Sequence, residues 1–519
     1  MENLQTKATP QGTAGYAQKH KELAYRSLGN TGLVVSEAGF GSYRLFLTEE
    51  SHKTALKTAL QSGINLIDTS ANYTDGQSEE LIGQVLTELT NSGELARDEV
   101  VIVSKGGYLQ GSNLARYQEG QATGNTISPE VLVFNETLAH SIHPDFLRDQ
   151  IAASLARLNL SVIDCYLLHN PEYFFLWAKE QGMEQDAARR EFLRRIEAAF
   201  IYLEQEVAAG RIGCYGISSN DFPTPADAYE AVSLSDIWQI AEKIAPTHHF
   251  KVVEFPLNIY EPGAILEKNQ PGGQSLLSFA AAQELAVLIN RPLNAMKGDS
   301  ICRLTELSGE TFRHIELLVE QIRALMELEE VFRRKFITVL PDQDLANPAL
   351  FKGLNSGEVL QKHWYTFDSY WHWQDVNHSY FIPVIQTSID ILLKSSALNQ
   401  ELTCWIDDYV AQLNPLFKNI AAYYRGREQQ RVKLDKAALA AADPDWSEAA
   451  SLSQLALRTI RSTLGVTSVL VGMRQSTYVE DVLEDLKKPV AVAPREVSWQ
   501  KLQEATSKID LDSLALLGE

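Results

Sequence analysis

The chain has 519 residues, of which 45% are hydrophobic and 22% are charged, and its formal net charge is -21. This composition is typical of a globular protein with a large core, and its negative charge argues against binding to nucleic acid or to anionic membranes. No stretch approaches the roughly 20 apolar residues of a membrane span. Scattered cysteines and a polar N-terminus without an apolar signal segment predict a cytoplasmic protein with reduced thiols.

Short apolar runs alternate with helical patterns along most of the chain. After a flexible arm at 1–22, a hairpin is expected at 25–36, around Gly29-Asn30-Thr31-Gly32. Strands are expected at 34–39, 64–68, 100–104, 162–168, 212–218, 251–255, 286–290 and 467–471. Helices are expected at 52–61, 78–89, 144–158, 186–209, 225–244, 273–284, 448–464 and 499–509. Eight such steps without an internal GxGxxG motif predict an α/β fold of the (β/α)8 TIM barrel type.

Two segments are longer than ordinary connections. Residues 106–143, after the third strand, are rich in Gly, Gln, Asn and Ser and are expected to form an irregular loop insertion. Residues 297–445, after the seventh strand, have helical periodicity and predict a long α-helical insertion, in which Pro415 ends or kinks a helix. The predicted domains are the arm 1–22, the barrel 23–296 plus 446–519, and the helical insertion subdomain 297–445. Both insertions join a strand to a helix, so they are expected to stand over the active-site face of the barrel.

Four reactive side chains follow or end three successive predicted strands: Asp68, Tyr73, Lys105 and His169. Each alone has an ordinary structural explanation, but a closed barrel brings strand ends together, so the set favours an active site. An ammonium beside a phenol favours the phenolate and is expected to lower the tyrosine pKa. Asp68 would hold Lys105, and His169 would bind a substrate oxygen. Such an acid suits protonation of a carbonyl oxygen, and the hydride must then come from a bound nicotinamide.

Six motifs are spread in order over most of 23–296 and 446–486: YRSLGNTGLVVSEAGFGS, GINLIDTSANYTDGQSEELIG, VIVSKGG, SLARLNLSVIDCYLLHNP, GRIGCYGISSN and LALRTIRSTLGVTSVLVGMRQSTYVEDVLE. In these motifs the chain resembles the aldo-keto reductase superfamily, particularly its branch with voltage-gated potassium channel β subunits and bacterial general-stress reductases. The resemblance implies a catalytic tetrad of Asp68, Tyr73, Lys105 and His169, with Tyr73 as the proton donor in reduction. It also implies NADPH, with NADH as the alternative, bound without a Rossmann fold.

The resemblance further implies a row of cofactor-binding residues along the strand ends. They are Gly41, Ser42, Ser218, Ser219, Asn220, Glu254, Arg291, Leu293, Gly472, Arg474 and Glu480. The chain departs from the family at four of the corresponding positions: Glu254 replaces the usual Gln, Leu257 the stacking aromatic, Tyr478 an Arg, and Val482 an Asn. Arg474 is left as the candidate for a 2′-phosphate.

The helical insertion contains HWYTFDSYWHWQDVNHSYF at 363–381. The histidine spacing matches no zinc pattern, so no metal site is predicted. A packed aromatic core is expected, and a wall of the substrate pocket or a partner surface are the alternatives.

The leading hypothesis is an NADP(H)-dependent oxidoreductase that reduces a small-molecule aldehyde or ketone to an alcohol, or catalyses the reverse. The first alternative is a cofactor-sensing regulatory or scaffold protein with little turnover. A sugar or polyol lyase or isomerase is the second alternative. The sequence leaves the oligomeric state open.

Overall fold

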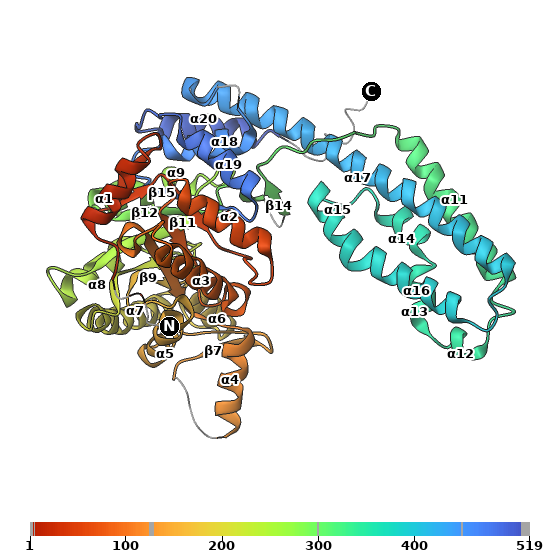
Figure 1. Cartoon of the computed structure of the whole chain (residues 1–519), viewed down its shortest axis with the longest axis horizontal. Helices are drawn as coiled ribbons and strands as arrows, with labels where there is room; N and C mark the ends of the chain where they lie inside the picture. Colours follow the sequence, from red (N-terminus) through yellow and green to blue (C-terminus); the bar gives the residue numbers. More distant parts are fainter. Residues whose placement is uncertain (1–3, 5, 124–128, 298–299, 448–449, 510–519) are drawn as a thin grey trace. The chain divides into compact units, whose positions relative to one another are not determined.

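The computed structural model describes residue 4 and residues 6–123, 129–297, 300–447 and 450–509. The chain divides into two compact units (Figure 1). The barrel unit comprises the chain up to Met296 together with Leu439–Glu504, and the helical unit comprises Lys297–Ala438 together with the chain after Glu504. We propose that the helical unit is the predicted insertion subdomain, with its return to the barrel somewhat earlier than residue 445.

Eight parallel strands close the barrel, in the order β10-β11-β12-β15-β3-β4-β5-β9. Their bounds are β3 Ala38–Gly41, β4 Leu66–Asp68, β5 Val101–Gly106, β9 Ile163–His169, β10 Ile212–Ser218, β11 Phe250–Pro256, β12 Ala286–Asn290 and β15 Ser468–Gly472. Neighbours in the barrel are successive strands of the predicted series, so the (β/α)8 fold is confirmed. The hairpin of β1 (Tyr25–Ser27) and β2 (Val34–Ser36) is also present.

Helices surround the barrel: α2 Glu50–Gln61, α3 Gln77–Asn91, α5 Pro144–Leu158, α6 Tyr173–Glu180, α7 Gln185–Ala208, α8 Leu234–Ile244, α9 Gly263–Leu266, α10 Leu276–Ala282, α18 Leu452–Arg461, α19 Ser476–Leu486 and α20 Glu496–Thr506. One prediction needs correction, because α8 begins at Leu234 and not near residue 225. Ser233 caps the helix by accepting a hydrogen bond from the Asp236 amide, whereas Pro223 and Pro225 precede it in a turn region.

The N-terminal segment is not simply a flexible arm, so this prediction is wrong for its second half. Helix α1 spans Pro10–Lys19, and the Thr9 side chain caps it by accepting from the Gly12 amide. The Tyr16 side chain is buried, and its hydroxyl donates to the carbonyl of Leu60 in α2. The buried ring of Tyr16, together with the contacts of Thr9 with Asp98 and of Lys19 with Glu99, therefore fixes this segment.

The segment after β5 is also more regular than predicted. It forms β6 (Tyr108–Leu109), helix α4 (Gly111–Ala122), β7 (Leu132–Asn135) and β8 (Leu138–His140). The three strands make a small antiparallel sheet in the order β6-β8-β7. Strands this short carry too few alternating residues to be visible among Gly, Gln and Asn, which is why the expected irregular loop is wrong.

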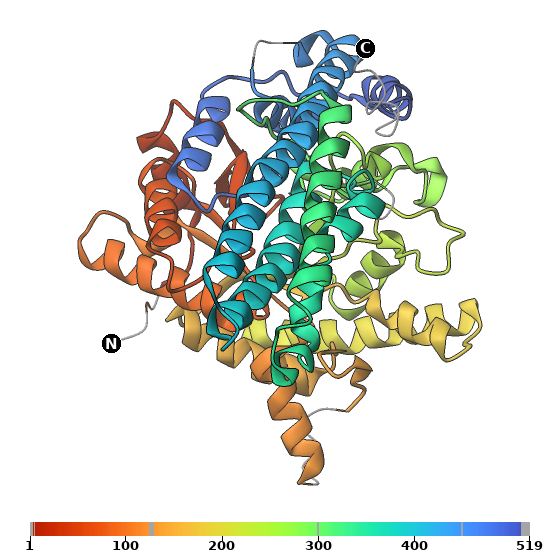
Figure 2. The ribbon, with the colours of Figure 1, turned by 90° about the vertical axis from the view of Figure 1, so that its right-hand side faces the viewer.

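Helices make up most of the helical unit. Before them come two short strands, β13 (Asn294–Lys297), whose last residue begins this unit, and β14 (Ser300–Arg303). The helices are α11 Ile315–Lys335, α12 Asp342–Leu345, α13 Pro348–Gly353, α14 Ser356–His363, α15 Tyr370–Val376, the π-helical turn Asn377–Phe381, α16 Ile382–Lys394 and α17 Gln400–Ala442. The long helices α11 and α17 lie side by side (Figures 1 and 2), where the Trp405 indole donates to the carbonyl of Leu328. Helix α17 continues through Pro415, so this proline does not end it.

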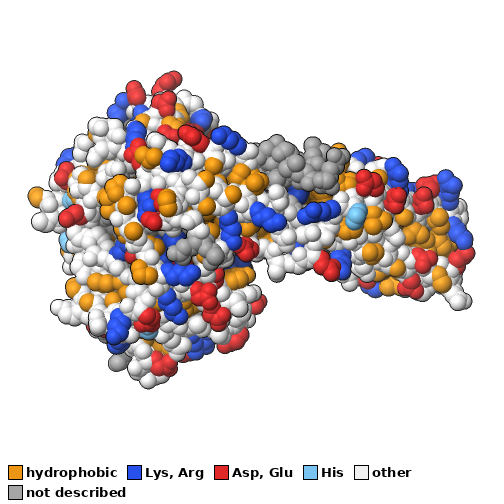
Figure 3. Space-filling model, turned by 90° about the horizontal axis from the view of Figure 1, so that it is seen from above, with side chains coloured by type: hydrophobic (Ala, Val, Ile, Leu, Met, Phe, Trp, Pro, Cys, Tyr) orange, Lys and Arg blue, Asp and Glu red, His pale blue; other side chains and the backbone are white. Residues whose placement is uncertain are grey.

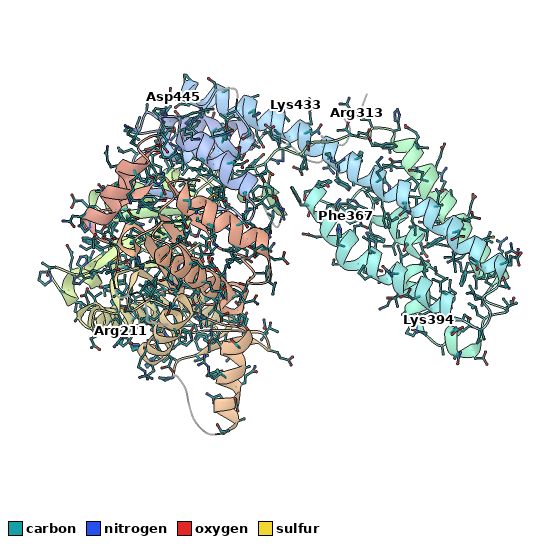
Figure 4. The ribbon with its side chains drawn as sticks, in the orientation of Figure 1. Arg211, Arg313, Phe367, Lys394, Lys433 and Asp445 are labelled. Atoms are coloured by element: carbon teal, nitrogen blue, oxygen red, sulfur yellow. The ribbon has the colours of Figure 1, made fainter. Side chains whose placement is uncertain are left out.

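The aromatic segment 363–381 packs into the core of the helical unit, as predicted. Trp373 and Phe381 are buried there together with Phe367, which is labelled in Figure 4. Tyr365 and Tyr380 of the same segment are exposed. The segment is therefore largely explained by packing.

On the outside of the molecule, basic and acidic side chains are interspersed over the face drawn in Figure 3.

Candidate active site

The predicted reactive side chains form one polar layer in the barrel. Along each strand, alternate residues point inward, and the lower inward positions are apolar: Leu66, Val103, Leu167 and Val252 belong to one buried cluster. The next inward position on each of those four strands carries the polar layer, which consists of Asp68, Lys105, His169 and Glu254. The layer lies at the carboxyl ends of the strands, where the active sites of such barrels are found.

Lys105 is the centre of this layer. Its side chain is fully buried, and its ammonium lies 2.7 Å from the carboxylate of Asp68. The same ammonium donates to the Tyr73 hydroxyl at 3.2 Å. The Asp–Lys–Tyr arrangement expected from the sequence is therefore present in the structure.

Tyr73 projects from a turn with unusual backbone geometry. The turn Tyr73–Gly76 directly follows β4, and Thr74 and Asp75 have φ angles of 50° and 55°. This left-handed conformation is uncommon outside glycine and is found often at functional sites. The turn is held from outside, because the Thr74 hydroxyl donates to the Leu45 carbonyl and Asp75 accepts from the amide and hydroxyl of Ser112.

His169 is neutral and enclosed by aromatic rings. Its ring lies 5.9 Å from that of Tyr73 and 4.8 Å from that of Tyr108, both edge to face. Its Nδ1 lies 2.9 Å from the hydroxyl of Ser70. Burial, together with Lys105 and His140, lowers the pKa of His169 well below its usual value. Ser70 and Tyr108 were missed in the sequence, although Ser70 stands inside the LIDTSANY motif.

Glu254, which the sequence predicts to bind the cofactor, is also a member of the polar layer. Its Oε2 lies 3.2 Å from the Lys105 ammonium. Its Oε1 accepts a hydrogen bond from the Asn290 amide at 3.0 Å. Two carboxylates thus share one ammonium. The alternation along β11 contains the signal for this, since Glu254 has the same parity as the inward Val252.

The electrostatics of this layer reverse one expectation. Burial raises the pKa of Asp68 to about 8; Lys105 opposes the shift, and Glu254 adds to it. Burial likewise raises the pKa of Tyr73 above its ordinary value. Lys105 opposes this shift, whereas Asp68 and Glu254 add to it. The expectation that the Tyr73 pKa is lowered is therefore wrong. Tyr73 keeps its proton at neutral pH.

The predicted carboxamide-binding residues lie at the ends of β10 and its neighbours. Ser218 ends β10, the Ser219 amide donates to the Glu254 carbonyl, and the Asn220 amide donates to Glu172 Oε1 at 2.8 Å. Within the described part of the chain, Glu172 Oε2 and Asn290 Oδ1 are buried and have no hydrogen-bond partner. Unpartnered acceptors of this kind are costly unless a ligand or water satisfies them. They suit the amide group of a nicotinamide.

Beyond β12, Arg291 is committed to its own loop. Its guanidinium pairs with Glu261 at 2.8 Å, and its carbonyl accepts from Asn258. Glu261 also accepts from the Met296 amide at 3.0 Å. Leu293 of this loop is half-buried. The structure thus gives Arg291 a role in shaping the loop that was predicted to cover a pyrophosphate.

The remaining predicted cofactor residues follow β3 and β15. A side chain at Gly41 would place its Cβ 3.3 Å from the Val471 carbonyl, whereas a Cβ at Gly472 would meet open space. Ser42 is fully buried, and its hydroxyl accepts from Ser78 at 2.7 Å. Arg474 is half-buried. The pKa of His52 is lowered mainly by burial and next by the charge of Arg474. Glu480 is exposed on α19. Gly472 and Arg474 are open to a ligand, but the Ser42 hydroxyl is used inside the fold.

Comparisons with known proteins agree with the family resemblance seen in the sequence. Residues 37–248 match the model of the aldo/keto reductase family, which confirms the resemblance to that family. The "NADH-specific methylglyoxal reductase" of Escherichia coli K12 is 29% identical over 150 residues, which cover 27% of this chain and 40% of the relative. A "putative voltage-gated potassium channel subunit beta" of Schizosaccharomyces pombe is 30% identical over 156 residues, which cover 29% of this chain and 38% of the relative. The matches therefore span less than half of either relative.

A solved structure is also similar. It is a crystal structure of an aldo/keto reductase from Klebsiella pneumoniae in complex with NADP and acetate, with a TM-score of 0.32 and 19% identity. The match covers 51% of this chain and 67% of that one.

In the described residues, no helix combines the length and apolarity that a membrane crossing requires. No three His, Cys, Asp or Glu side chains of the described ranges are grouped to hold a metal ion.

Proposed function

We propose that the protein is an NADP(H)-dependent oxidoreductase that reduces an aldehyde or ketone to an alcohol, or oxidises the alcohol in reverse. The observation that carries this proposal is the Tyr73 hydroxyl, 3.2 Å from a buried ammonium at the carboxyl end of the barrel. The family match over residues 37–248 supports it. A phenol poised beside a fixed cation has little use in packing, and it suits proton transfer to a substrate oxygen.

Each member of the polar layer has a role in this chemistry. Tyr73 holds its proton at neutral pH and donates it to the carbonyl oxygen in the reduction. Lys105 stabilises the phenolate that develops as the proton leaves, because its charge is fixed in a site from which water is excluded. Asp68 orients Lys105. The neutral ring of His169 lies beside Tyr73 and would form a hydrogen bond with the same substrate oxygen.

A nicotinamide cofactor, when bound, supplies the hydride. We assign its carboxamide to Ser218, Ser219 and the unpartnered Oδ1 of Asn290. We assign the far end of the cofactor to Gly472 and Arg474. NADPH is the proposed form because Arg474 is available for a 2′-phosphate. NADH is the alternative, and one relative carries NADH specificity in its name.

The test is a fluorescence titration with NADPH and NADH, followed by turnover assays on a panel of small carbonyl compounds. The wild type is expected to bind one cofactor and to turn over at least one carbonyl. Tyr73→Phe should bind the cofactor equally well and lose about 100-fold to 10,000-fold in kcat, the usual contribution of a positioned acid. Undiminished turnover in Tyr73→Phe would refute the assignment. Tight binding without turnover on any carbonyl would instead favour the cofactor-sensing alternative.

A further inference from the structure

The surroundings of Lys105 contain one more carboxylate than its charge can balance. Asp68 and Glu254 both lie against this ammonium, and their side chains are 5% and 2% exposed. Asp68 Oδ1 lies 2.7 Å from the Lys105 ammonium, and Glu254 Oε2 lies 3.2 Å from it. Neither oxygen has a hydrogen bond to another group among the residues that the structure describes. Both carboxyl groups therefore depend on the same cation.

A single proton resolves this arrangement. With both carboxyl groups ionised, the buried cluster carries a net negative charge, which is costly away from water. With one proton, the cluster is neutral, and a hydrogen bond can join the two carboxyl groups. Two carboxylates in one site commonly share a proton in this way.

We propose that Asp68 and Glu254 share one proton at neutral pH, that Glu254 is a positioning residue, and that loss of the shared proton sets the alkaline limit of turnover. The first half stands on the geometry alone. The second half rests on the proposed function, because it concerns the acid strength of Tyr73.

The groups that face this proton support a coupling to Tyr73. From the neighbouring elements these groups are Asp68 on β4, Tyr73 in the following turn, Lys105 on β5 and neutral His169 on β9. On the flanking strands, Ser218 and Asn290 do not titrate in this range. Burial and Glu254 raise the pKa of Asp68 against the opposing effect of Lys105. Loss of the shared proton adds a negative charge beside Lys105, which weakens its support of a Tyr73 phenolate and slows proton donation.

The first experiment measures thermal stability against pH and needs no substrate. A carboxyl group whose folded-state pKa is raised destabilises the fold progressively as pH rises from its unfolded value of about 4 to its folded value. Glu254→Gln removes the second carboxylate and keeps the shape. The Tm of the variant minus that of the wild type should therefore grow between pH 5 and pH 8, by at least about 2 °C.

Glu206→Gln is the matched control. Glu206 lies on α7, is fully buried and accepts from the Tyr202 hydroxyl and the Arg211 guanidinium, at the opposite end of the barrel. Its Tm difference from wild type should not follow the pH dependence of Glu254→Gln. A Tm difference for Glu254→Gln that stays flat from pH 5 to pH 8 would overturn the shared proton. If this variant does not fold, infrared titration of the wild type tests the shared proton instead. The absorption band of the protonated carboxyl group shared by Asp68 and Glu254 should disappear between pH 6 and pH 10.

The second experiment measures kcat for carbonyl reduction against pH. Wild-type kcat is expected to fall on the alkaline side, where the shared proton is lost. Glu254→Gln has no shared proton to lose, so the charge beside Lys105 stays constant and the midpoint of the fall should move upward by about 1 pH unit or more. An unchanged midpoint would overturn the positioning role while leaving the shared proton to the stability data. Absence of turnover in the wild type would refute the proposed function, and the Tm result would still decide whether the proton is shared.

Discussion

Each of the two units buries a cation between two carboxylates, and the clusters around Lys105 and Arg431 differ in a way that bears on function. In the helical unit, Arg431 pairs with Glu428 at 2.8 Å and with Asp435 at 2.5 Å, all on α17. Its guanidinium also donates to the carbonyl of Arg303. In the barrel unit, Lys105 faces carboxylates from two different strands and a phenol from a turn.

The difference lies in the geometry of the cation. A guanidinium has five donors in a planar fork and can serve two carboxylates at once, whereas an ammonium is a point charge with three donors. The arginine cluster uses neighbouring positions of one helix, so it ties that helix to the incoming chain. The lysine cluster holds its two carboxylates by one point charge and places a titratable phenol at its edge. The same ratio of charges thus serves packing around Arg431 and, in the proposed reaction, proton transfer around Lys105.

Removal of each cation should give the largest effects and test this contrast directly. Lys105→Met and Arg431→Met each leave buried carboxylates without their cation, which typically lowers the free energy of unfolding by about 3–5 kcal/mol. The two variants should differ in turnover per folded molecule, which Lys105→Met loses and Arg431→Met keeps. Chemical denaturation combined with kcat measurement checks both. Normal kcat in Lys105→Met would contradict the role assigned to the barrel cluster.

The pH dependence of these two variants sharpens the comparison. In Lys105→Met the remaining carboxyl groups can take up protons, so their folded-state pKa values rise further. The stability lost relative to wild type should therefore be smaller at pH 5 than at pH 8. Denaturation midpoints at the two pH values measure this. A loss that is greater at pH 5 would contradict a buried, proton-sharing pair.

A smaller effect is expected where the barrel cluster meets His169. Ser70→Ala removes the hydroxyl 2.9 Å from His169 Nδ1. One neutral hydrogen bond contributes about 0.5–1.5 kcal/mol, so kcat should fall about 2-fold to 10-fold if the bond orients the ring. The control is Ser92→Ala at the end of α3, which should leave kcat unchanged. An unchanged kcat in Ser70→Ala would show that His169 is held by its aromatic neighbours alone.

The smallest effect concerns stability far from either cluster. Tyr16→Phe removes the hydroxyl that donates to the Leu60 carbonyl and leaves the aromatic packing of α1 intact. The free energy of unfolding should fall by about 1–3 kcal/mol, because a buried acceptor loses its partner. Equilibrium denaturation measures the change, and kcat should stay the same. No loss of stability would mean that α1 is held by its ring packing alone.

The sequence predicts the barrel well because short apolar runs that alternate with helical patterns are a strong signal. It fails in the segment after β5, where strands such as Tyr108–Leu109 are too short to show a period. The positions of Asp68, Tyr73, Lys105 and His169 follow from the strand ends together with the family resemblance. The sign of the Tyr73 pKa shift does not, because it depends on complete burial and on Glu254, which lies 181 positions after Tyr73 in the sequence.

The turn that carries Tyr73 has a consequence for anyone who redesigns the protein. Asp75 accepts two hydrogen bonds from Ser112, at the start of α4, and a Cβ at Gly111 would lie 2.6 Å from Asp75 Oδ1. The start of segment 106–143 is therefore fastened to the turn of Tyr73, the proposed proton donor. Exchanging this segment for another, as a way to change the substrate range, would move Tyr73 as well, unless the glycine and the serine are carried over with it.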